Sequence, residues 1–262
     1  MFGTDWFRPS NLSQYWQNRE ILPSITTIPG FGTAWSQKVA EIGKLGLKRA
    51  CIFPTCLKYD KRQELYKELE KTDLKQIPFA HIRDDFDIHE LGYLRDRWGT
   101  EVFNIHTRNY HNFLNPVFDG FRKNIFIEIS PGTLFSQVPM ESFGGMCIDF
   151  AHLENDSHSP EYPNQNQEII ERLKTRFSDH DQAVKTFKAG CSHISAYPKN
   201  KWDGYLDKDW NEIRCDLHVY KDLSDFDYLK KYFDYLPNIN AMELQNSLEE
   251  QIKAIQYIYK MG

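Results

Sequence analysis

Short apolar runs alternate with amphipathic stretches along almost the whole chain, from about residue 22 onward. The apolar runs have the length of buried strands, and the amphipathic stretches have the length and period of helices. The predicted strands cover about residues 24–28, 48–53, 77–81, 101–106, 125–129, 145–150, 186–194 and 239–244. Strands that alternate with helices form a parallel sheet, and eight such strands close into a barrel. The pattern therefore predicts a single (β/α)₈ TIM barrel of the α/β class.

Helix boundaries are marked by capping residues. Three predicted helices begin with a polar residue that is followed three positions later by Glu or Gln: Asp60/Gln63, Asp87/Glu90 and Ser247/Glu250. A further helix, with the sequence DFDYLKKYFDYL, is predicted to begin at Ser224, and another covers about residues 165–177. Gly46 and Gly99 follow the last periodic residues of their helices, as glycines at helix C-termini do.

The length of 262 residues is typical of one TIM barrel. The sequence contains no linker or shift in composition, so residues 1–262 are predicted to form one domain. Residues 1–21, which include Trp6, Phe7 and Trp16, are expected to be an N-terminal extension that packs on the barrel.

Charge and cysteine content narrow the class of protein. The net charge is −5 and no basic block is present, which disfavours nucleic acid as a partner. The five cysteines form no CxxC pair, and Cys51, Cys147 and Cys191 lie in apolar runs, as buried reduced thiols do. No apolar stretch approaches 18 residues and no leader pattern opens the chain, so we expect a cytoplasmic protein without a membrane partner. The sequence makes no prediction about the oligomeric state.

Metal-ligand side chains recur where six of the predicted strands end or shortly after. The apolar runs IPFAH, VFNIH, IFIE, MCID and AME all stop on such a residue, and GCSH ends the same way. With three residues just beyond a strand or in a following segment, the candidate metal ligands are His81, His106, Glu128, Asp149, His152, His193, Asp216, His218 and Glu243. Barrel active sites are built at the C-terminal ends of the strands. The pattern is therefore typical of a metalloenzyme.

Alternation along each strand predicts which way these residues point. Asn104 and His106 share one face of their strand, while Phe103 and Ile105 share the other. The same rule turns the polar end of each of the other strands toward the barrel interior. Buried carboxylates that converge without a cation would repel one another and lose their hydration. A divalent metal removes both penalties.

The remaining histidines are not predicted to be ligands. His89 is expected on an exposed helix face, and His158 and His180 in polar loops, while His111 is left undecided. The segment 195–222 carries Lys199 and Lys201, which are open as substrate contacts. It also contains the aromatic residues Trp202, Tyr205 and Trp210, whose simplest role is to anchor the loop.

The order of the candidate ligands resembles that of the xylose isomerase-like TIM barrels, which include sugar isomerases, epimerases and endonuclease IV-type enzymes. Glu128, Asp149, His193 and Glu243 are similar to the metal quartet of that superfamily. Two His, a Glu, an Asp-x-x-His, a His, an Asp-x-His and a Glu, here His81 to Glu243, resemble the trinuclear zinc set of endonuclease IV. The resemblance implies a metal-dependent enzyme with a small phosphorylated or sugar substrate.

Three chemistries remain open at this stage. Nine candidate ligands exceed the needs of one ion, which favours a multinuclear, zinc-class hydrolase of a phosphate ester with Glu128 as the bridging carboxylate. The alternative is a mononuclear Mn-, Mg- or Zn-dependent isomerase or epimerase of a sugar or sugar phosphate. In that case Glu128 or Glu243 would shuttle the proton. A multinuclear iron oxidative enzyme is the third, because His, Asp and Glu also bind iron.

Overall fold

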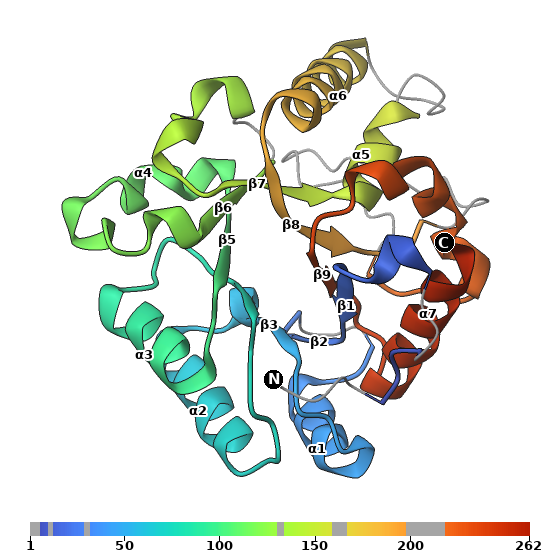
Figure 1. Cartoon of the computed structure of the whole chain (residues 1–262). Coiled ribbons are helices and arrows are strands. Elements are labelled where there is room, and N and C mark those ends of the chain that lie inside the picture. Colours follow the sequence, from blue (N-terminus) through green and yellow to red (C-terminus); the bar gives the residue numbers. More distant parts are fainter. Residues whose placement is uncertain (1–5, 10–12, 29–31, 130–133, 159–166, 198–217) are drawn as a thin grey trace.

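Parallel strands form the centre of the molecule, with helices around them (Figure 1). The computed structural model describes residues 6–9, 13–28, 32–129, 134–158, 167–197 and 218–262. The strands are β1 (Glu20–Leu22), β2 (Ser24–Thr26), β3 (Cys51–Phe53), β4 (Phe79–His81), β5 (Val102–His106), β6 (Ile125–Glu128), β7 (Gly145–Asp149), β8 (Ala189–Ile194) and β9 (Ile239–Met242). They pair in the order β1-β9-β8-β7-β6-β5-β4-β3-β2, and every pairing is parallel.

The sheet closes on itself through Pro23. β1 pairs with β9 and β2 pairs with β3, yet only Pro23 separates β1 from β2 in the chain. Proline has no N–H to donate to a strand ladder, so the strand breaks there into two halves that serve different neighbours. The carbonyl of Pro23 still accepts a hydrogen bond from Cys51 N at 2.8 Å. The two halves count as one barrel strand, and the predicted (β/α)₈ barrel is confirmed.

Side chains hold the seam between β2 and β9, where no backbone ladder is formed. Thr26 Oγ1 donates to Leu244 O at 2.9 Å, and Ser24 Oγ donates to Met242 O. Gln251 Nε2 donates to Ser24 O at 3.0 Å. Lys38, whose side chain is completely buried, donates from Nζ to Leu244 O at 2.7 Å and to Thr26 Oγ1 at 2.8 Å. The seam therefore depends on polar side chains that satisfy buried carbonyls.

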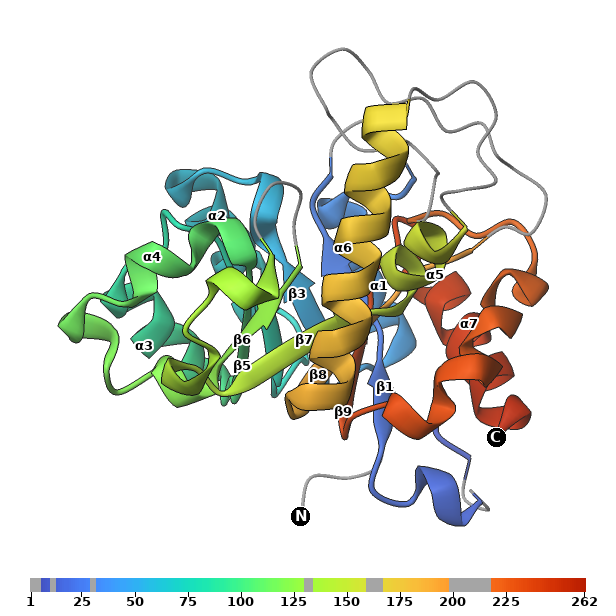
Figure 2. The same ribbon diagram turned by 90° about the horizontal axis from the view of Figure 1, so that it is seen from above.

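Helices cover the outside of the barrel. They are α1 (Trp35–Leu45), α2 (Tyr59–Glu70), α3 (Ile88–Trp98), α4 (Tyr110–Phe113), α5 (Phe150–Ser157), α6 (Gln167–Thr186) and α7 (Leu248–Met261), with a 3-10 helix at Leu223–Tyr235. The last helix, α7, packs against α1 and β2, which closes the helical ring beside the seam. The long helix α6 packs against α5 and β7 (Figure 2). Within the described ranges, no helix combines the length and apolar character needed to cross a membrane.

The predicted start of the first strand at residue 24 is the start of β2. The prediction missed β1, which covers Glu20–Leu22 on the other side of Pro23. Just before this strand, Trp16 is buried with its ring 5.0 Å from that of Tyr259 and 5.7 Å from that of Phe233. Phe7 is also buried, whereas Trp6 is exposed.

One of the three predicted capping boxes is confirmed, because Ser247 and Glu250 bond reciprocally. Asp87 caps its helix by accepting a hydrogen bond from Glu90 N, but the Glu90 carboxylate pairs with Arg62 instead of completing the box. The third is wrong, because α2 begins at Tyr59 and Lys58 occupies its N-cap position. Gly46 and Gly99 adopt the left-handed conformation expected at helix C-termini.

Two predicted boundaries near the end of the chain also shift. The helix predicted to begin at Ser224 is capped instead by Asp222, whose carboxylate accepts from Ser224 N at 2.8 Å. Helix α6 extends to Thr186 rather than ending near residue 177, and β8 consequently begins at Ala189. The prediction ended this helix too early because residues 177–186 are mostly polar, and the amphipathic pattern is clear only over the full length of α6.

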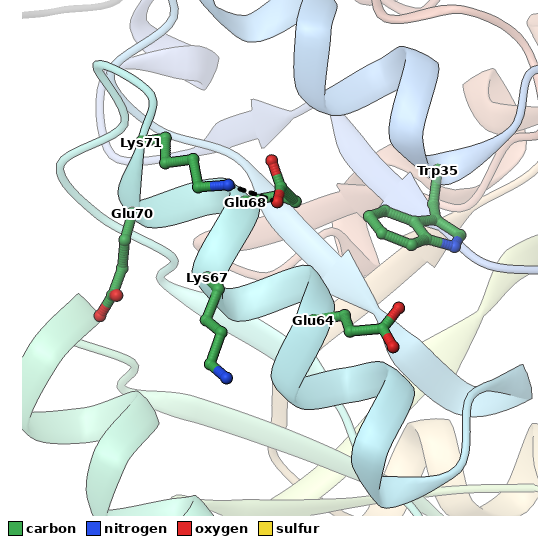
Figure 3. A pocket seen from close by; sticks show the side chains of 6 residues that line it. All are labelled: Trp35, Glu64, Lys67, Glu68, Glu70 and Lys71. Carbon is green, nitrogen blue, oxygen red and sulfur yellow. Dashed lines mark hydrogen bonds and ion pairs between the residues drawn. The ribbon is translucent and has the colours of Figure 1, made fainter.

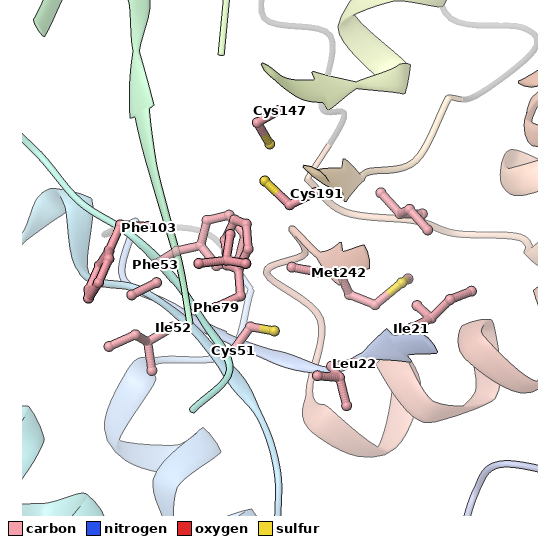
Figure 4. Close-up of a cluster of buried hydrophobic side chains, with 14 of the residues drawn as sticks. Ile21, Leu22, Cys51, Ile52, Phe53, Phe79, Phe103, Cys147, Cys191 and Met242 are labelled. Carbon is pink, nitrogen blue, oxygen red and sulfur yellow. The ribbon is translucent and has the colours of Figure 1, made fainter. Parts of the chain in front are cut away.

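Apolar side chains fill the barrel beneath its mouth (Figure 4). The rings of Phe53 and Phe79 lie 5.5 Å apart, and Cys51, Cys147 and Cys191 are buried as predicted. The ring of Phe53 is 5.0 Å from that of His193. This layer gives the candidate ligands an apolar floor that excludes water.

The seam generates a prediction about stability and pH. Burial lowers the pKa of Lys38 to about 7, so between about pH 7 and pH 10 the unfolded state binds more protons at this site than the folded state. Stability must therefore rise with pH in that window. Relative to Lys38→Met, wild type should gain about 3 kcal/mol of unfolding free energy between these pH values. Urea unfolding of both proteins measures this, and a difference that does not vary with pH would contradict it.

Candidate metal centre

The candidate ligands gather at the C-terminal ends of the strands. His81, His106, Glu128 and Asp149 are the last residues of β4, β5, β6 and β7. His193 is the penultimate residue of β8, and Glu243 directly follows β9. The sheet register places His106 beside Glu128 and Asp149 beside His193. The structure thus brings six of the nine predicted side chains to one mouth from six different strands.

Glu128 lies at the centre of the group. Its Oε1 is 3.8 Å from His106 Nε2, and its Oε2 is 3.7 Å from His81 Nε2 and 3.5 Å from His193 Nδ1. Glu128 is buried, and so are His81 and His193. The two oxygens of one carboxylate therefore face different sets of imidazoles.

His193 is surrounded by carboxylates. Its Nδ1 lies 3.1 Å from Glu243 Oε2, 3.5 Å from Glu128 Oε2 and 3.8 Å from Asp149 Oδ2. Among the described residues, three sets of side chains have the spacing of a metal site, because the potential ligand atoms within each set lie within 4.8 Å of one another. The sets are His81/His193/Glu243, His81/His106/Glu128 and Glu128/Asp149/His193. Because the sets overlap, a single compact centre accounts for all of them.

His152 occupies the first turn of helix α5, three residues after Asp149. Asp149 is the N-cap of that helix, and its Oδ1 accepts from His152 N at 2.8 Å. The helix holds His152 Nε2 3.7 Å from Asp149 Oδ2. A single aspartate thus ends a strand, begins a helix and keeps Oδ2 directed toward the ligand group.

His218 approaches from the segment before the 3-10 helix. Its Nδ1 is 3.1 Å from Glu243 O, and its carbonyl accepts from Gln245 N. The rings of His218 and His152 have centroids 6.4 Å apart. The ninth candidate, Asp216, lies outside the described residues, as do Lys199, Lys201 and the aromatic residues of the same segment.

Burial and neighbouring charges divide the protons among these groups. Burial raises the pKa of Glu128 to about 8, and Glu243 and Asp149 add to the shift while His193 opposes it. Burial disfavours the charged form of His193, but Cys147, Glu128 and Glu243 outweigh this and raise its pKa well above the usual range. Without a metal, the surroundings therefore favour the neutral form of Glu128 and the charged form of His193.

The other members respond differently. Burial favours the neutral form of Asp149, yet His152 and His193 hold the pKa of Asp149 below its usual value. His193 and His218 likewise lower the pKa of Glu243 against the effect of burial. Burial, together with His106 and His193, keeps the pKa of His81 well below the ordinary histidine value. Neutral His81 and ionised Asp149 and Glu243 are in the forms that bind metals.

Two buried atoms of the centre support the fit to a cation. Asp149 Oδ2 and His193 Nδ1 are inaccessible to water and make no hydrogen bond of good geometry, although Glu243 Oε2 lies 3.1 Å from His193 Nδ1. They are 3.8 Å apart, which is too long for a hydrogen bond and leaves both directed at the same region. Nitrogen and carboxylate oxygen donors of this kind suit zinc and also manganese or iron.

None of the other histidines belongs to the three ligand sets among the described residues. His89 and His111, the latter left undecided by the sequence, are exposed on α3 and α4, and His158 lies 3.1 Å from Glu154 Oε1 at the end of α5. The placement of His180 in a polar loop is wrong. It is completely buried in α6 with its ring 5.7 Å from that of Phe135, and burial lowers its pKa to about 3.

Sequence reasoning missed Asn104 as a member of the site. It is buried in β5, its partner in the sheet register is His81, and its amide reaches the ligands. The signal was present, since Asn104 precedes His106 by two residues and shares its face. Asparagine drew no attention because it is an uncommon metal ligand.

A separate hollow lies between helices α1 and α2 (Figure 3). Its lining consists of Trp35 and five charged side chains of α2 and its C-terminus: Glu64, Lys67, Glu68, Glu70 and Lys71. Lys71 and Glu68 pair with each other across it. The hollow contains none of the candidate ligands and lies in the outer helical layer.

Comparison with solved structures shows a likeness of fold. No family model matches the chain, and no curated protein matches it. The structure is similar to a xylose isomerase domain-containing protein from Salmonella typhimurium LT2, with 13% sequence identity and a TM-score of 0.39. The match covers 95% of this chain and 96% of that one. The barrel itself is established by the strand pairing described above, and the chemistry must be argued from the site.

The proton arrangement generates a prediction. Metal ligation requires Glu128 ionised and His193 neutral, so metal binding at about pH 7 should release about one to two protons. The number should fall toward about pH 9.5, since Glu128, with a pKa of about 8, is already ionised there. Calorimetric titration with Zn²⁺ in buffers of different ionisation enthalpy measures the release. Binding without proton release at neutral pH would contradict this electrostatic description.

Proposed function

We propose that the chain is a metal-dependent hydrolase of a phosphate ester, with at least two zinc-class ions that share Glu128. One observation carries the proposal. Glu128 Oε1 faces His106, while Oε2 faces His81 and His193. A carboxylate whose two oxygens meet different imidazoles has the arrangement of a bridging ligand.

The ligand sets divide between two neighbouring positions. His106 and Glu128 Oε1 would belong to one position, and Glu128 Oε2, Asp149 and His193 to the other, with His81 within reach of both. Glu243 lies within reach of His81 and His193 and would complete the set of ligands around the second ion. His152 and His218 stand at the rim, with Asp216 as a further candidate. When bound, such a pair of ions lowers the pKa of water and stabilises both the attacking and leaving oxygens of a displacement.

The protein's own residues supply the remaining requirements. Phe53 and Phe79 form a dry floor under His193, which strengthens electrostatic interactions in the mouth. Asp149 is fixed by its bond to His152 N, so its Oδ2 keeps one direction. Glu128 and Glu243 are the carboxylates placed to accept a proton from a reacting group.

Two arginines near the mouth favour an anionic substrate. Arg83 follows His81 by two residues and donates from Nη1 to Thr55 O at 2.6 Å, on the neighbouring β3–α2 connection. Arg108 follows His106 by two residues, is exposed, and adds to the groups that lower the pKa of His81. Guanidinium groups bind phosphate oxygens through paired N–H donors. A phosphate ester fits these surroundings better than an uncharged sugar.

One observation favours a second candidate, a mononuclear sugar or sugar-phosphate isomerase. Oxygens of Glu128, Asp149 and Glu243 all lie within 3.8 Å of His193 Nδ1, which is also the arrangement of a single four-ligand site. In that case His81 and His106 would contact substrate hydroxyls. The two candidates therefore differ in what those two histidines do.

Substitution of His81 and His106 separates the candidates. For the hydrolase, wild type purified without chelator should contain about two to three ions per chain, and His81→Ala or His106→Ala should each lose about one. Turnover of a chromogenic aryl phosphate should fall at least about 100-fold, because an ion that stabilises the transition state is lost. Elemental analysis and the colorimetric assay measure the two effects.

His89→Ala is the matched control, since His89 is an exposed histidine of α3. It should retain the metal content and turnover of wild type. Glu128→Gln keeps the size of the side chain but removes its charge, and it should leave at most one ion. An unchanged metal content near one in both His variants, together with activity on a ketose, would reject the hydrolase in favour of the isomerase.

A further inference from the structure

Arg62 is a completely buried arginine outside the metal centre. It lies near the start of α2, and its guanidinium makes five hydrogen bonds. Nε and Nη2 each donate to the Glu90 carboxylate at 2.8 Å. Nη1 donates to Leu57 O at 3.0 Å and to Asp85 Oδ2 at 2.8 Å, and Nη2 also donates to Asp85 O at 3.4 Å. A buried cation is stable only with partners of this kind. Arg62 therefore fastens α2 to two connections at the barrel mouth, β3–α2 through Leu57 and β4–α3 through Asp85.

The β4–α3 connection that Arg62 holds also carries Arg83. Phe86 N donates to Arg83 O at 3.2 Å, which closes a β-turn that starts two residues after the end of β4. The ring of Phe86 is buried, and the guanidinium carbon of Arg62 lies 4.0 Å from its centroid. Both ends of the turn are thus fixed, one by the strand and the other by the buried arginine.

Asp85 is shared between the two arginines. Its Oδ2 lies 2.8 Å from Nη1 of Arg62, and its Oδ1 lies 3.6 Å from Nε of Arg83. From the neighbouring connection, Thr55 O accepts a hydrogen bond from Arg83 Nη1 at 2.6 Å. Among the described residues, no hydrogen bond occupies Arg83 Nη2, and 40% of this side chain is exposed. The guanidinium is therefore held on two sides and keeps the two N–H donors of Nη2 for a ligand.

The position of Arg83 relative to the metal centre is indicated by Cys56. This cysteine lies on the β3–α2 connection, next to Thr55. Partial burial raises the pKa of its thiol, which a hydrogen bond with Thr55 and the charge of Arg83 oppose and the charge of Glu243 reinforces. Because effects of charge weaken with distance, Arg83 and Glu243 both lie near this thiol. Arg83 therefore stands at the rim of the candidate metal centre.

We infer that Arg83 binds a phosphate oxygen of the substrate at the rim of the metal centre, and that Asp85 is the positioning residue that holds its guanidinium there. The inference rests on the proposed hydrolase and names the side chain that recognises the anionic part of its substrate. Arginine suits this role because its planar guanidinium offers parallel N–H donors to phosphate, which an ammonium group cannot do. A side chain that is already fixed also loses little conformational freedom when the ligand binds.

The test measures binding of inorganic phosphate to the zinc-loaded protein by calorimetric titration. Arg83→Gln removes the charge, and it should raise the phosphate Kd by about 10–100-fold, the usual effect of losing a hydrogen bond to a charged group. Arg83→Lys should recover only part of this loss, because it lacks the planar fork. The zinc content of both variants should equal that of wild type. Arg95→Gln is the matched control, since Arg95 is an exposed arginine of α3 that pairs with Asp96, and it should keep the wild-type Kd.

A double substitution tests the role of Asp85. Asp85→Asn should raise the phosphate Kd about two- to fivefold, as expected for a partly exposed ion pair. In the Arg83→Gln background the same change should have no further effect, because Asp85 acts on phosphate only through Arg83. Thermal unfolding of each protein measures stability separately. An equal effect of Asp85→Asn in both backgrounds would overturn the positioning role.

The outcomes separate this inference from the proposed function. Hydrolysis of an aryl phosphate by wild type, with an unchanged phosphate Kd in Arg83→Gln, would overturn the role of Arg83 and leave the hydrolase standing. Phosphate binding that depends on Arg83, without hydrolysis, would support the role of Arg83 and reject the hydrolase. Loss of zinc from Arg83→Gln would overturn the inference, because Arg83 would then support the metal centre rather than the substrate.

Discussion

Three carboxylates and an imidazole converge in a space from which water is excluded, and this convergence constrains the rest of the molecule. Glu128, Asp149 and Glu243 surround His193 Nδ1 at 3.1–3.8 Å. In the absence of a cation, the group is tolerable only because Glu128 and His193 hold protons. If metal ions displaced those protons, the carboxylates would bind the cations directly and would no longer repel one another.

The barrel provides the rigidity that such a centre needs. Each of the six ligands comes from a different strand, so their separations are set by the sheet register rather than by a loop. The register in turn depends on closure, and closure depends on Pro23 and on the side chains that bridge β2 and β9. Lys38 and Gln251 therefore contribute to the site although they lie on helices outside the barrel. Burial of Lys38 in that seam lowers the stability of the fold. The lysine offsets part of this loss because it donates a hydrogen bond to Leu244 O, a carbonyl at the seam where no backbone ladder is formed.

The sequence alone predicted the barrel and the inward direction of its strand-end ligands. Alternation within β5 and β6 was sufficient to place His106 and Glu128 together, because strand periodicity and the common direction of parallel strands are local properties. It could not predict that strands lie on both sides of Pro23, because β1 forms by pairing with β9 and β2 by pairing with β3. It misjudged His180 because a helix that is polar in composition buries a histidine only through tertiary packing. Asn104 was visible on the inward face, but its contacts with Glu128, His81 and His193 exist only in the assembled barrel.

The central claim is that Glu128 bridges two metal positions. Anomalous diffraction from crystals of wild-type protein, grown without chelator and measured on both sides of the zinc absorption edge, tests it most directly. The account predicts at least two anomalous peaks about 3.5–4 Å apart. One should lie beside His106 and the other beside Asp149 and His193, with one Glu128 oxygen on each and His81 bound to one of them. A single peak surrounded by Glu128, Asp149, His193 and Glu243, with His81 and His106 unligated, would contradict it.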